Sequence, residues 1–410
     1  MKLSKIARRN IGRNRRRSLL SIAAIAVAAM TITFLTSMIE GMREDLSRNL
    51  INFYSGEVRI RNTEYEEYAQ LNPLHLYVPE YGTTAEVILA TEGVEAVSPR
   101  IEFPARIYAD EDSFRAFGVG YDPDYEADYQ DLSRIVTEGR LPKAGENEAI
   151  LGIRLADRIG AEIGDKFTIL STTRNRGTNA ITLIVAGIAA FPVETLNETH
   201  FFAPLDRIGY FLRMDEGVTE ILVKAEERVD NRKLADRIGK NLADAGHSGL
   251  EAVPWERIGT SYGMVRMMSI SYNFMAIFFF LLGSTVIITT TMMVVYERTK
   301  EIGTIAALGM TGREIVRLFF LEALFLALIG SGSGVAVGTG ISAVLGKTGM
   351  DLGTAMEGID LEISNVLYPR VNFKAVVFTF VYSVGVASLV SFIPSRKAAK
   401  IEPVKALRVV

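Results

Sequence analysis

The chain has 410 residues, of which 49% are hydrophobic, and its 45 basic and 48 acidic side chains give a net charge of −3. It contains no cysteine, which excludes a disulfide scaffold, a thiol nucleophile, an iron–sulfur cluster and a cysteine-ligated zinc site. The three histidines, His75, His200 and His247, are scattered without metal-ligand spacing, so we expect no catalytic, cofactor or metal site.

The N-terminal residues 1–17 are strongly basic, with apolar residues at helical spacing. This pattern is typical of a helix lying in a membrane interface, although a disordered basic leader is the alternative. Residues 18–40 follow as an apolar run long enough to cross a bilayer. The run continues past the signal-like Ala26-Val27-Ala28, so we expect an uncleaved transmembrane helix.

Residues 41–268 are polar and carry 25 basic and 38 acidic side chains, a net charge of −13. This charge argues against nucleic acid or anionic lipid as the partner of this segment. Alternating runs predict strands at 56–61, 106–109, 114–119, 166–170 and 181–186, and helical spacing predicts helices at 83–91 and 230–245. We expect an α+β domain with a β-rich subdomain, 131–213, inserted into it. The flanks 39–51 and 257–270 are expected to continue the neighbouring spans as helices.

Three further apolar segments, 272–296, 318–345 and 373–393, can each cross a membrane. Basic residues concentrate in 1–17, in the short segment 297–317 and in the tail 394–410, so the positive-inside rule makes these cytoplasmic. The 41–268 domain and the loop 346–372 are then extracytoplasmic. The sequence predicts an α-helical membrane protein with four transmembrane helices plus a large α+β extracytoplasmic domain inserted between the first and second.

The segment 297–317 predicts a short helix, a turn and a capped helix. Glu297–Leu308 can form a helix with Ile302, Ile305 and Leu308 on one side. Gly309 suits the position that ends it, and Thr311 with Glu314 forms a capping-box pattern for the next helix. A rigid piece between two spans suits the transmission of force, while a simple connector is the alternative.

The third apolar segment contains a glycine run and one acid. We interpret Gly330, Gly332, Gly334 and Gly338 as helix-packing positions rather than a ligand loop. Glu322 is an intramembrane acid and therefore a functional candidate near the membrane interface, but no polar path continues from it.

A nearby run, Gly340–Thr348, misses the Walker A pattern because Ile341 stands where glycine is required. We therefore expect no direct ATP binding by this chain.

Four stretches carry a family resemblance: ARRNIGRNRRRSLL, GRLPKAGENEAILGIRLADRIGAEIGDKFTIL, ERTKEIGTIAALG and PSRKAAKIEPVKALR. They resemble MacB/FtsX-type ABC transporter permeases, and the layout is most similar to the LolC/LolE lipoprotein-releasing permeases. The resemblance implies a homo- or heterodimer of four-span subunits in the bacterial inner membrane, each joined to a cytoplasmic ABC ATPase. It further implies that a coupling helix sits in a groove of that ATPase, formed by Glu297, Arg298, Glu301, Ile302, Gly303, Ile305, Ala306, Leu308 and Gly309.

The resemblance predicts a non-catalytic permease subunit that binds no cofactor itself and depends on ATP used by its partner. The subunit is expected to convert ATP hydrolysis by that partner into motion of periplasmic domains, which releases lipoproteins from the membrane. MacB-like export of a peptide or small amphiphile and FtsX-like regulation of cell-wall hydrolases are the alternatives. Gly41, Met42 and Met264–Met268 lie near the expected substrate entrance, and Ser171–Ala180 is the candidate loop for a periplasmic chaperone. Membrane lipids, but no nucleic acid, complete the expected partners.

Overall fold

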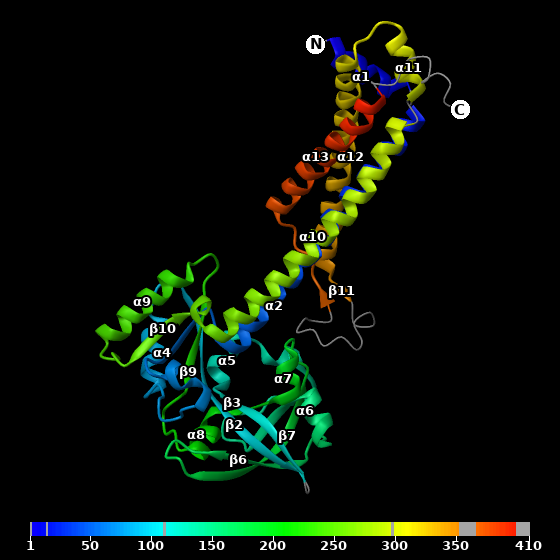
Figure 1. Ribbon diagram of the computed structural model, residues 1–410. Helices are drawn as coiled ribbons and strands as arrows, with labels where there is room; N and C mark the ends of the chain where they lie inside the picture. Colours follow the sequence, from blue (N-terminus) through cyan, green and yellow to red (C-terminus); the bar gives the residue numbers. More distant parts are fainter. Residues whose placement is uncertain (1, 14, 110–111, 297–298, 352–365, 399–410) are drawn as a thin grey trace. The chain divides into compact units, whose positions relative to one another are not determined.

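The computed structural model describes residues 2–13, 15–109, 112–296, 299–351 and 366–398 (Figure 1). The chain divides into two compact units. The helical unit comprises Met1–Glu44, Met268–Glu357 and Asn365–Val410, and the α/β unit comprises Asp45–Met267 and Gly358–Ser364. Each is described by itself.

Among the described residues, four helices have stretches long and apolar enough to cross a membrane, which agrees with the four predicted spans. Two of them, α2 and α10, continue beyond their apolar parts and carry residues of both units, as expected for the flanks 39–51 and 257–270. The tail beyond residue 398 and the loop residues 352–365 lie outside the described residues. The helices of this part of the chain are α1 (Lys2–Arg13), α2 (Arg15–Leu50), α10 (Gly259–Tyr296), α11 (Thr299–Ala307), α12 (Gly312–Thr348) and α13 (Phe373–Ala398).

Small and branched side chains from all four long helices meet in the centre of the helical unit. Ile25 and Ala28 of α2 pack with Ile287 of α10, Ala327 of α12 and Ala387 of α13. Three alanines among the five let the helices approach closely, which favours dispersion contacts between helices that lipid would otherwise solvate equally well.

The α/β unit is built on one mixed ten-stranded sheet. Its order is β10-β1-β9-β2-β3-β8-β5-β7-β4, and β6 pairs with both β2 and β7. The strands are β1 (Val58–Asn62), β2 (Val94–Ala109), β3 (Asp112–Tyr121), β4 (Val136–Gly139), β5 (Glu148–Gly152), β6 (Lys166–Thr172), β7 (Thr178–Ala189), β8 (His200–Pro204), β9 (Glu220–Ala225) and β10 (Leu250–Pro254). The helices are α3 (Tyr65–Tyr68), α4 (Tyr81–Leu89), α5 (Pro123–Tyr129), α6 (Ile153–Ile159), α7 (Glu194–Thr199), α8 (Leu205–Leu212) and α9 (Asn231–Asp244).

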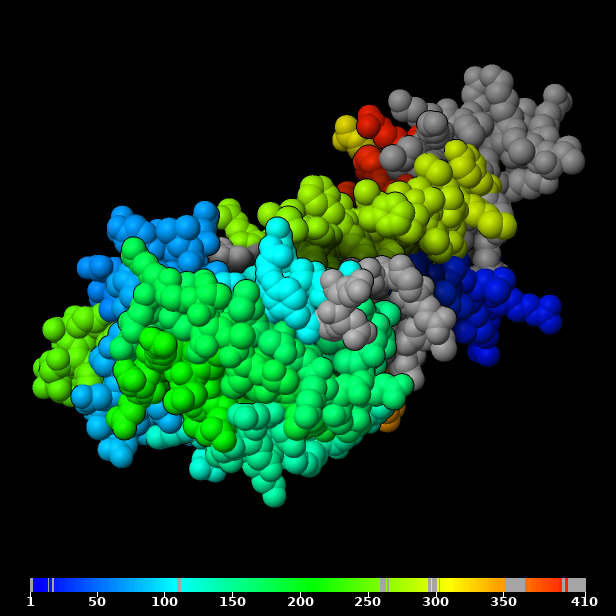
Figure 2. All heavy atoms as spheres, turned by 90° about the horizontal axis from the view of Figure 1, so that it is seen from below, coloured from blue at the N-terminus to red at the C-terminus, as the bar shows by residue number. Residues whose placement is uncertain are grey.

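The predicted strands and both predicted helices are present, but the strands β2 and β3 are much longer than the sequence runs indicated. Residues 131–213 supply β4 to β8, which gather toward one end of the sheet. The sheet nevertheless continues across that boundary through the parallel pairing of β3 with β8 and the antiparallel pairing of β2 with β6. In Figure 2 this segment merges with the rest of the α/β unit into one surface, and the structure separates no subdomain there.

A buried ion pair lies inside the α/β unit. The Arg100 guanidinium on β2 is 2.7 Å from the Glu126 carboxylate on α5, and the two side chains are 2% and 3% exposed. Ser98 and Gln130 also donate hydrogen bonds to Glu126. Because the remaining carboxylate lone pairs are occupied, the desolvation cost of the pair is offset within the fold.

We predict that Glu126→Gln lowers the free energy of unfolding of the α/β unit by about 3 kcal/mol, because the Arg100 cation then stays buried without a counter-charge. The matched control is Glu95→Gln on β2, the strand that carries Arg100; its pair with Lys224 is partly exposed, and its loss should change stability by less than about 1 kcal/mol. Denaturant unfolding of the full chain, followed through the fluorescence of Trp255, measures both. Equal losses in the two variants would contradict the prediction.

Candidate functional site

The turn between α11 and α12 is closed by backbone hydrogen bonds. The Gly309 N–H donates to the Ala306 carbonyl at 3.0 Å and the Met310 N–H to the Ile305 carbonyl at 3.3 Å. Gly309 has φ +92°, which a residue with a side chain adopts only with strain. This is the Schellman arrangement that ends a helix and satisfies its last carbonyls. The predicted helix end at Gly309 is confirmed.

The start of α12 is fixed by the predicted capping box. The Thr311 N–H donates to the Glu314 carboxylate at 3.0 Å, and the Thr311 hydroxyl donates to the same oxygen at 2.7 Å. Thr311 and Glu314 therefore hold the first turn of α12 in a single arrangement.

The turn is also packed against α12. Ile305, Ala306 and Met310 pack against the buried side chains of Ile315 and Phe319. Apolar contact across a Schellman turn commonly accompanies this hydrogen-bond pattern. Together with the cap, it ties α11 to α12 as one piece.

The predicted coupling residues occupy different surroundings. Ile305 and Ala306 are half-buried against α12, whereas Leu308 is 83% exposed because it follows the last helical residue of α11. Gly303 is buried, Glu301 and Gly309 are exposed, and the side chain of Ile302 is not described. Glu297 and Arg298 lie outside the described residues.

Three of the predicted packing glycines, spaced four residues apart on α12, face the backbone of α2. Glycine is needed there because a Cβ would collide with carbonyl oxygens. An ideal Cβ would lie 2.9 Å from the Ile22 oxygen at Gly330, against the Ala26 oxygen at Gly334 and 2.8 Å from the Met30 oxygen at Gly338. We call this contact the glycine seat; its two helices can approach this closely only while the α12 positions carry no side chain.

The other singled-out residues of α12 lie apart from the glycine seat. At Gly332 an added Cβ would make only an ordinary contact with Phe380, at 3.8 Å, and at Gly340 it would meet nothing within 4 Å. The Glu322 side chain is 3% exposed. The acid is thus buried within the helical unit rather than extended toward solvent.

The α2 helix ends in the α/β unit in a π-helical turn, η1 (Ile51–Ser55), which we call the joint. The Gly56 N–H closes it onto the Ile51 carbonyl at 2.7 Å. The buried Arg100 guanidinium donates to the Phe53 carbonyl at 2.8 Å, and the Phe53 ring meets Phe191 edge-on at 5.7 Å. The joint is therefore held by the same arginine that pairs with Glu126 inside the sheet.

His200 lies beside the joint at the start of β8. Its ring stacks on Phe117 at 5.4 Å and meets Tyr54 of the joint edge-on at 6.2 Å. Burial disfavours the charged imidazolium and lowers the pKa of His200 to about 4. The histidine is therefore a neutral packing residue at neutral pH, which sequence spacing alone did not reveal.

The residues near the predicted substrate entrance are partly engaged in packing. Gly41 of α2 leaves room for the Tyr368 carbonyl, and the Asn372 amide donates to Glu40 at 3.0 Å. Met267 is 63% exposed, while the side chain of Met264 is not described. Within the described residues, Ser171–Ala180 forms the β6–β7 hairpin rather than an extended loop.

Two family profiles cover most of the chain. The MacB-like periplasmic core domain matches residues 18–241, and the FtsX-like permease C-terminal region matches residues 273–403. The chain belongs to the FtsX-like ABC transporter permeases with a MacB-like periplasmic core domain. It is accordingly a membrane protein, and the α/β unit is its core domain.

Three similar permeases show how far the likeness extends. The chain is 25% identical to the macrolide export ATP-binding/permease protein MacB of Chlorobium luteolum, over 96% of this chain but only 58% of that protein. It is 24% identical to the uncharacterized ABC transporter permease YvrN of Bacillus subtilis, over 98% of both chains. It is 19% identical to the lipoprotein-releasing system transmembrane protein LolC of Neisseria meningitidis, over 95% of this chain and 94% of that one.

We predict that Gly334→Ala in this permease lowers thermal stability by about 1–3 kcal/mol, because the new methyl group would force the two helices of the glycine seat apart. Gly340→Ala on the same helix is the matched control. It meets open space and should be neutral or stabilising by up to about 1 kcal/mol through helix propensity. Thermal unfolding of the purified full chain in detergent decides the outcome. If Gly334→Ala and Gly340→Ala shift the unfolding temperature by the same amount in the same direction, the proposed contact at Gly334 is refuted.

We predict that the core domain loses about 2 kcal/mol of stability between pH 7 and pH 5 through His200. Its folded pKa of about 4 lies below the unfolded value of 6.5, so the unfolded state binds the extra proton in this window and stability falls as pH falls. The pKa of Glu57, which burial raises, acts in the opposite direction. The free energy of unfolding is measured from pH 7 to pH 5 for the wild type and for His200→Gln. The difference between the two pH dependences cancels the contribution of Glu57, which both proteins share. Identical slopes would show that His200 does not titrate in this way.

Proposed function

We propose that this chain is the permease subunit of an ABC complex in which a separate cytoplasmic ATPase binds α11. The permease chain is then non-catalytic, binds no nucleotide and converts ATP hydrolysis into motion of its core domain. A second permease subunit, either a copy or a paralogue, completes the complex.

The observation that carries this proposal is the set of contacts that ties α11, α12 and α2 together, with α2 continuing in the chain to the core domain. The Schellman turn and the cap fix α11 to α12, and the glycine seat fixes α12 to α2. Helix α2 is then a single helix from Arg15 to Leu50, and the joint that follows is held by Arg100. A displacement of α11 would therefore be passed on to α12 and α2, and α2 is continuous in the chain with the core domain.

The distribution of charge supports an inner-membrane location with both termini in the cytoplasm. Residues 1–17, 297–317 and 394–410 are rich in arginine and lysine, and the core domain is acidic. In this orientation α11 faces the compartment that holds ATP, and the core domain is periplasmic.

We further propose that the complex releases lipoproteins from the inner membrane. The likeness to the LolC protein supports this, because it extends over nearly the full length of both chains. Helix α10 exposes Phe274, Phe278 and Leu281, and this apolar face suits a second subunit or an acylated substrate entering laterally from the bilayer. The β6–β7 hairpin is the corresponding candidate for docking a periplasmic chaperone.

Export of a peptide or small amphiphile is the second candidate. The higher identity to a macrolide export protein favours it, although this chain spans little more than half of that protein. Mass spectrometry of the complex purified with its ATPase separates the two candidates. A co-purified triacylated lipoprotein supports release, whereas a bound soluble peptide without a lipid anchor favours export.

The coupling role gives a direct prediction. Ile305→Pro should break α11 and Glu301→Lys should reverse its charge, so each should abolish substrate-stimulated ATP hydrolysis in the reconstituted complex while membrane insertion is retained. Glu227→Lys, a charge reversal at an exposed turn of the core domain, is the control and should leave stimulation intact. Wild-type stimulation in both α11 variants would exclude α11 as the coupling element.

A further inference from the structure

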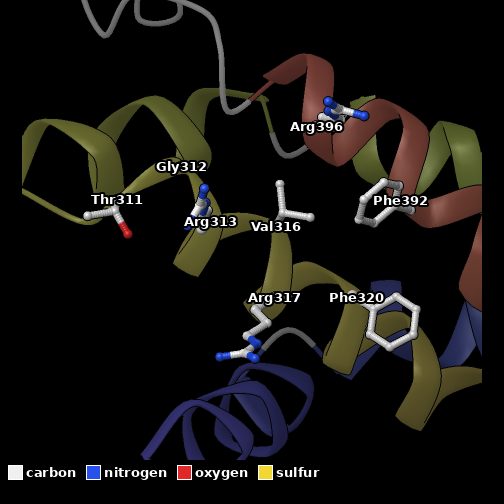
Figure 3. Close-up of a pocket in the computed structure, with 8 residues that line it drawn as sticks. All are labelled: Thr311, Gly312, Arg313, Val316, Arg317, Phe320, Phe392 and Arg396. Atoms are coloured by element: carbon white, nitrogen blue, oxygen red, sulfur yellow. The ribbon is translucent and has the colours of Figure 1, made fainter.

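A pocket of about 810 Å³ lies between the first turns of α12 and the last turns of α13 (Figure 3). Its volume falls in the range of about 300–1,000 Å³ that is typical of small-molecule sites. The lining residues combine arginines with apolar side chains: Thr311, Gly312, Arg313, Val316, Arg317, Phe320, Phe392 and Arg396.

The three arginines provide positive charge that the described structure does not neutralise. Arg313, Arg317 and Arg396 are exposed, and no ion pair joins any of them to a carboxylate within the described part of the chain. Glu314, on the same turn as Arg313, is engaged by Thr311 in the cap of α12 and does not line the pocket. An anion entering the pocket would thus meet donors without displacing an internal partner.

The apolar side chains are arranged in register with these arginines. On α12, Phe320 follows Arg317 by three residues toward the middle of the helix, and on α13, Phe392 precedes Arg396 by one turn. Along each helix the aromatic residue therefore lies nearer than the arginine to the middle of the apolar stretch. Figure 3 shows the Phe320 and Phe392 rings and Arg396 on one side of Val316, and the Arg313 and Arg317 side chains on the other.

We propose that this pocket binds one anionic phospholipid. The arginines receive the headgroup phosphate, and Val316, Phe320 and Phe392 receive the first part of an acyl chain. Arginine suits this task because its planar donors match phosphate oxygens. The proposed orientation of the permease places the site at the cytoplasmic leaflet, where basic residues attract anionic lipid.

Charge complementarity and the membrane setting favour a lipid over a soluble anion or a protein segment. Both helices that form the pocket belong to stretches apolar enough to cross a membrane, so the Phe320 and Phe392 end of the pocket lies beside lipid chains. A free phosphate would use only the arginines and leave the aromatic end of the pocket empty. A phospholipid uses both.

Native mass spectrometry of the purified full chain in a neutral detergent tests the proposal. The probes are phosphatidylglycerol and phosphatidylcholine with the same acyl chains, and inorganic phosphate serves as a competitor. We expect phosphatidylglycerol to bind about tenfold more tightly than phosphatidylcholine, and the combined variant Arg313→Gln, Arg317→Gln and Arg396→Gln to remove that preference. Phe392→Ala should weaken both lipids, because it removes acyl-chain contact without changing charge.

Arg9→Gln is the matched control, since Arg9 is an exposed arginine of α1 outside the pocket, and it should keep the preference. If the triple variant fails to fold, as judged by Trp255 fluorescence and elution volume, the single variant Arg396→Gln should still lower the preference about threefold. Equal affinity for the two lipids, or an unchanged preference in a folded arginine variant, would overturn the proposal. Displacement of phosphatidylglycerol by equimolar inorganic phosphate would show a plain anion site instead.

Discussion

The close approach of α12 to α2 is the constraint on which the helical unit depends. At Gly334 the Ala26 carbonyl occupies the place of a side chain, and the same relation recurs one turn away on either side. Lipid solvates apolar side chains as well as a helix does, so burial alone cannot hold two membrane helices together. The glycine surface of α12, which fits against the α2 backbone, can do so. The turn that joins α11 to α12 then fixes the position of α11 relative to this contact.

The joint that follows α2 is held in the core domain by a polar contact as well as by the packing of Phe53 on Phe191. Arg100 lies on the central strand β2 and shares its guanidinium between Glu126 and the carbonyl of Phe53 in the joint. A π-turn leaves its carbonyls less regularly paired than an α-helix does, so it can offer one to a side chain. A buried ion pair is costly to break, and this gives the joint a defined orientation on the sheet.

Local signals explain what could be predicted from the sequence. Gly309, Thr311 and Glu314 interact with residues only a few positions away in the sequence. The end of α11 and the cap of α12 could therefore be inferred without knowing which helices pack against them. The glycine run indicated that α12 packs closely against another helix. Only the position of α2 shows that Gly334 is at this contact whereas Gly332 and Gly340 are not. The role of Arg100 and the pocket formed with Arg396 escaped detection because their partners lie far away in the sequence. The positive-inside rule already accounted for Arg313, Arg317 and Arg396 as residues that set membrane orientation. The sequence therefore provided no separate reason to expect a pocket at these arginines.

The glycine seat also has a consequence for biosynthesis. Its two surfaces are about 300 residues apart in the chain, at Ile22 and Gly330. At about 5–20 residues per second, synthesis separates their appearance by roughly 15–60 s. During that interval the α2 surface that packs on the glycines has no α12 to contact, while the whole core domain is made. The order of the segments thus leaves this surface of α2 to lipid or an insertion factor until α12 is made.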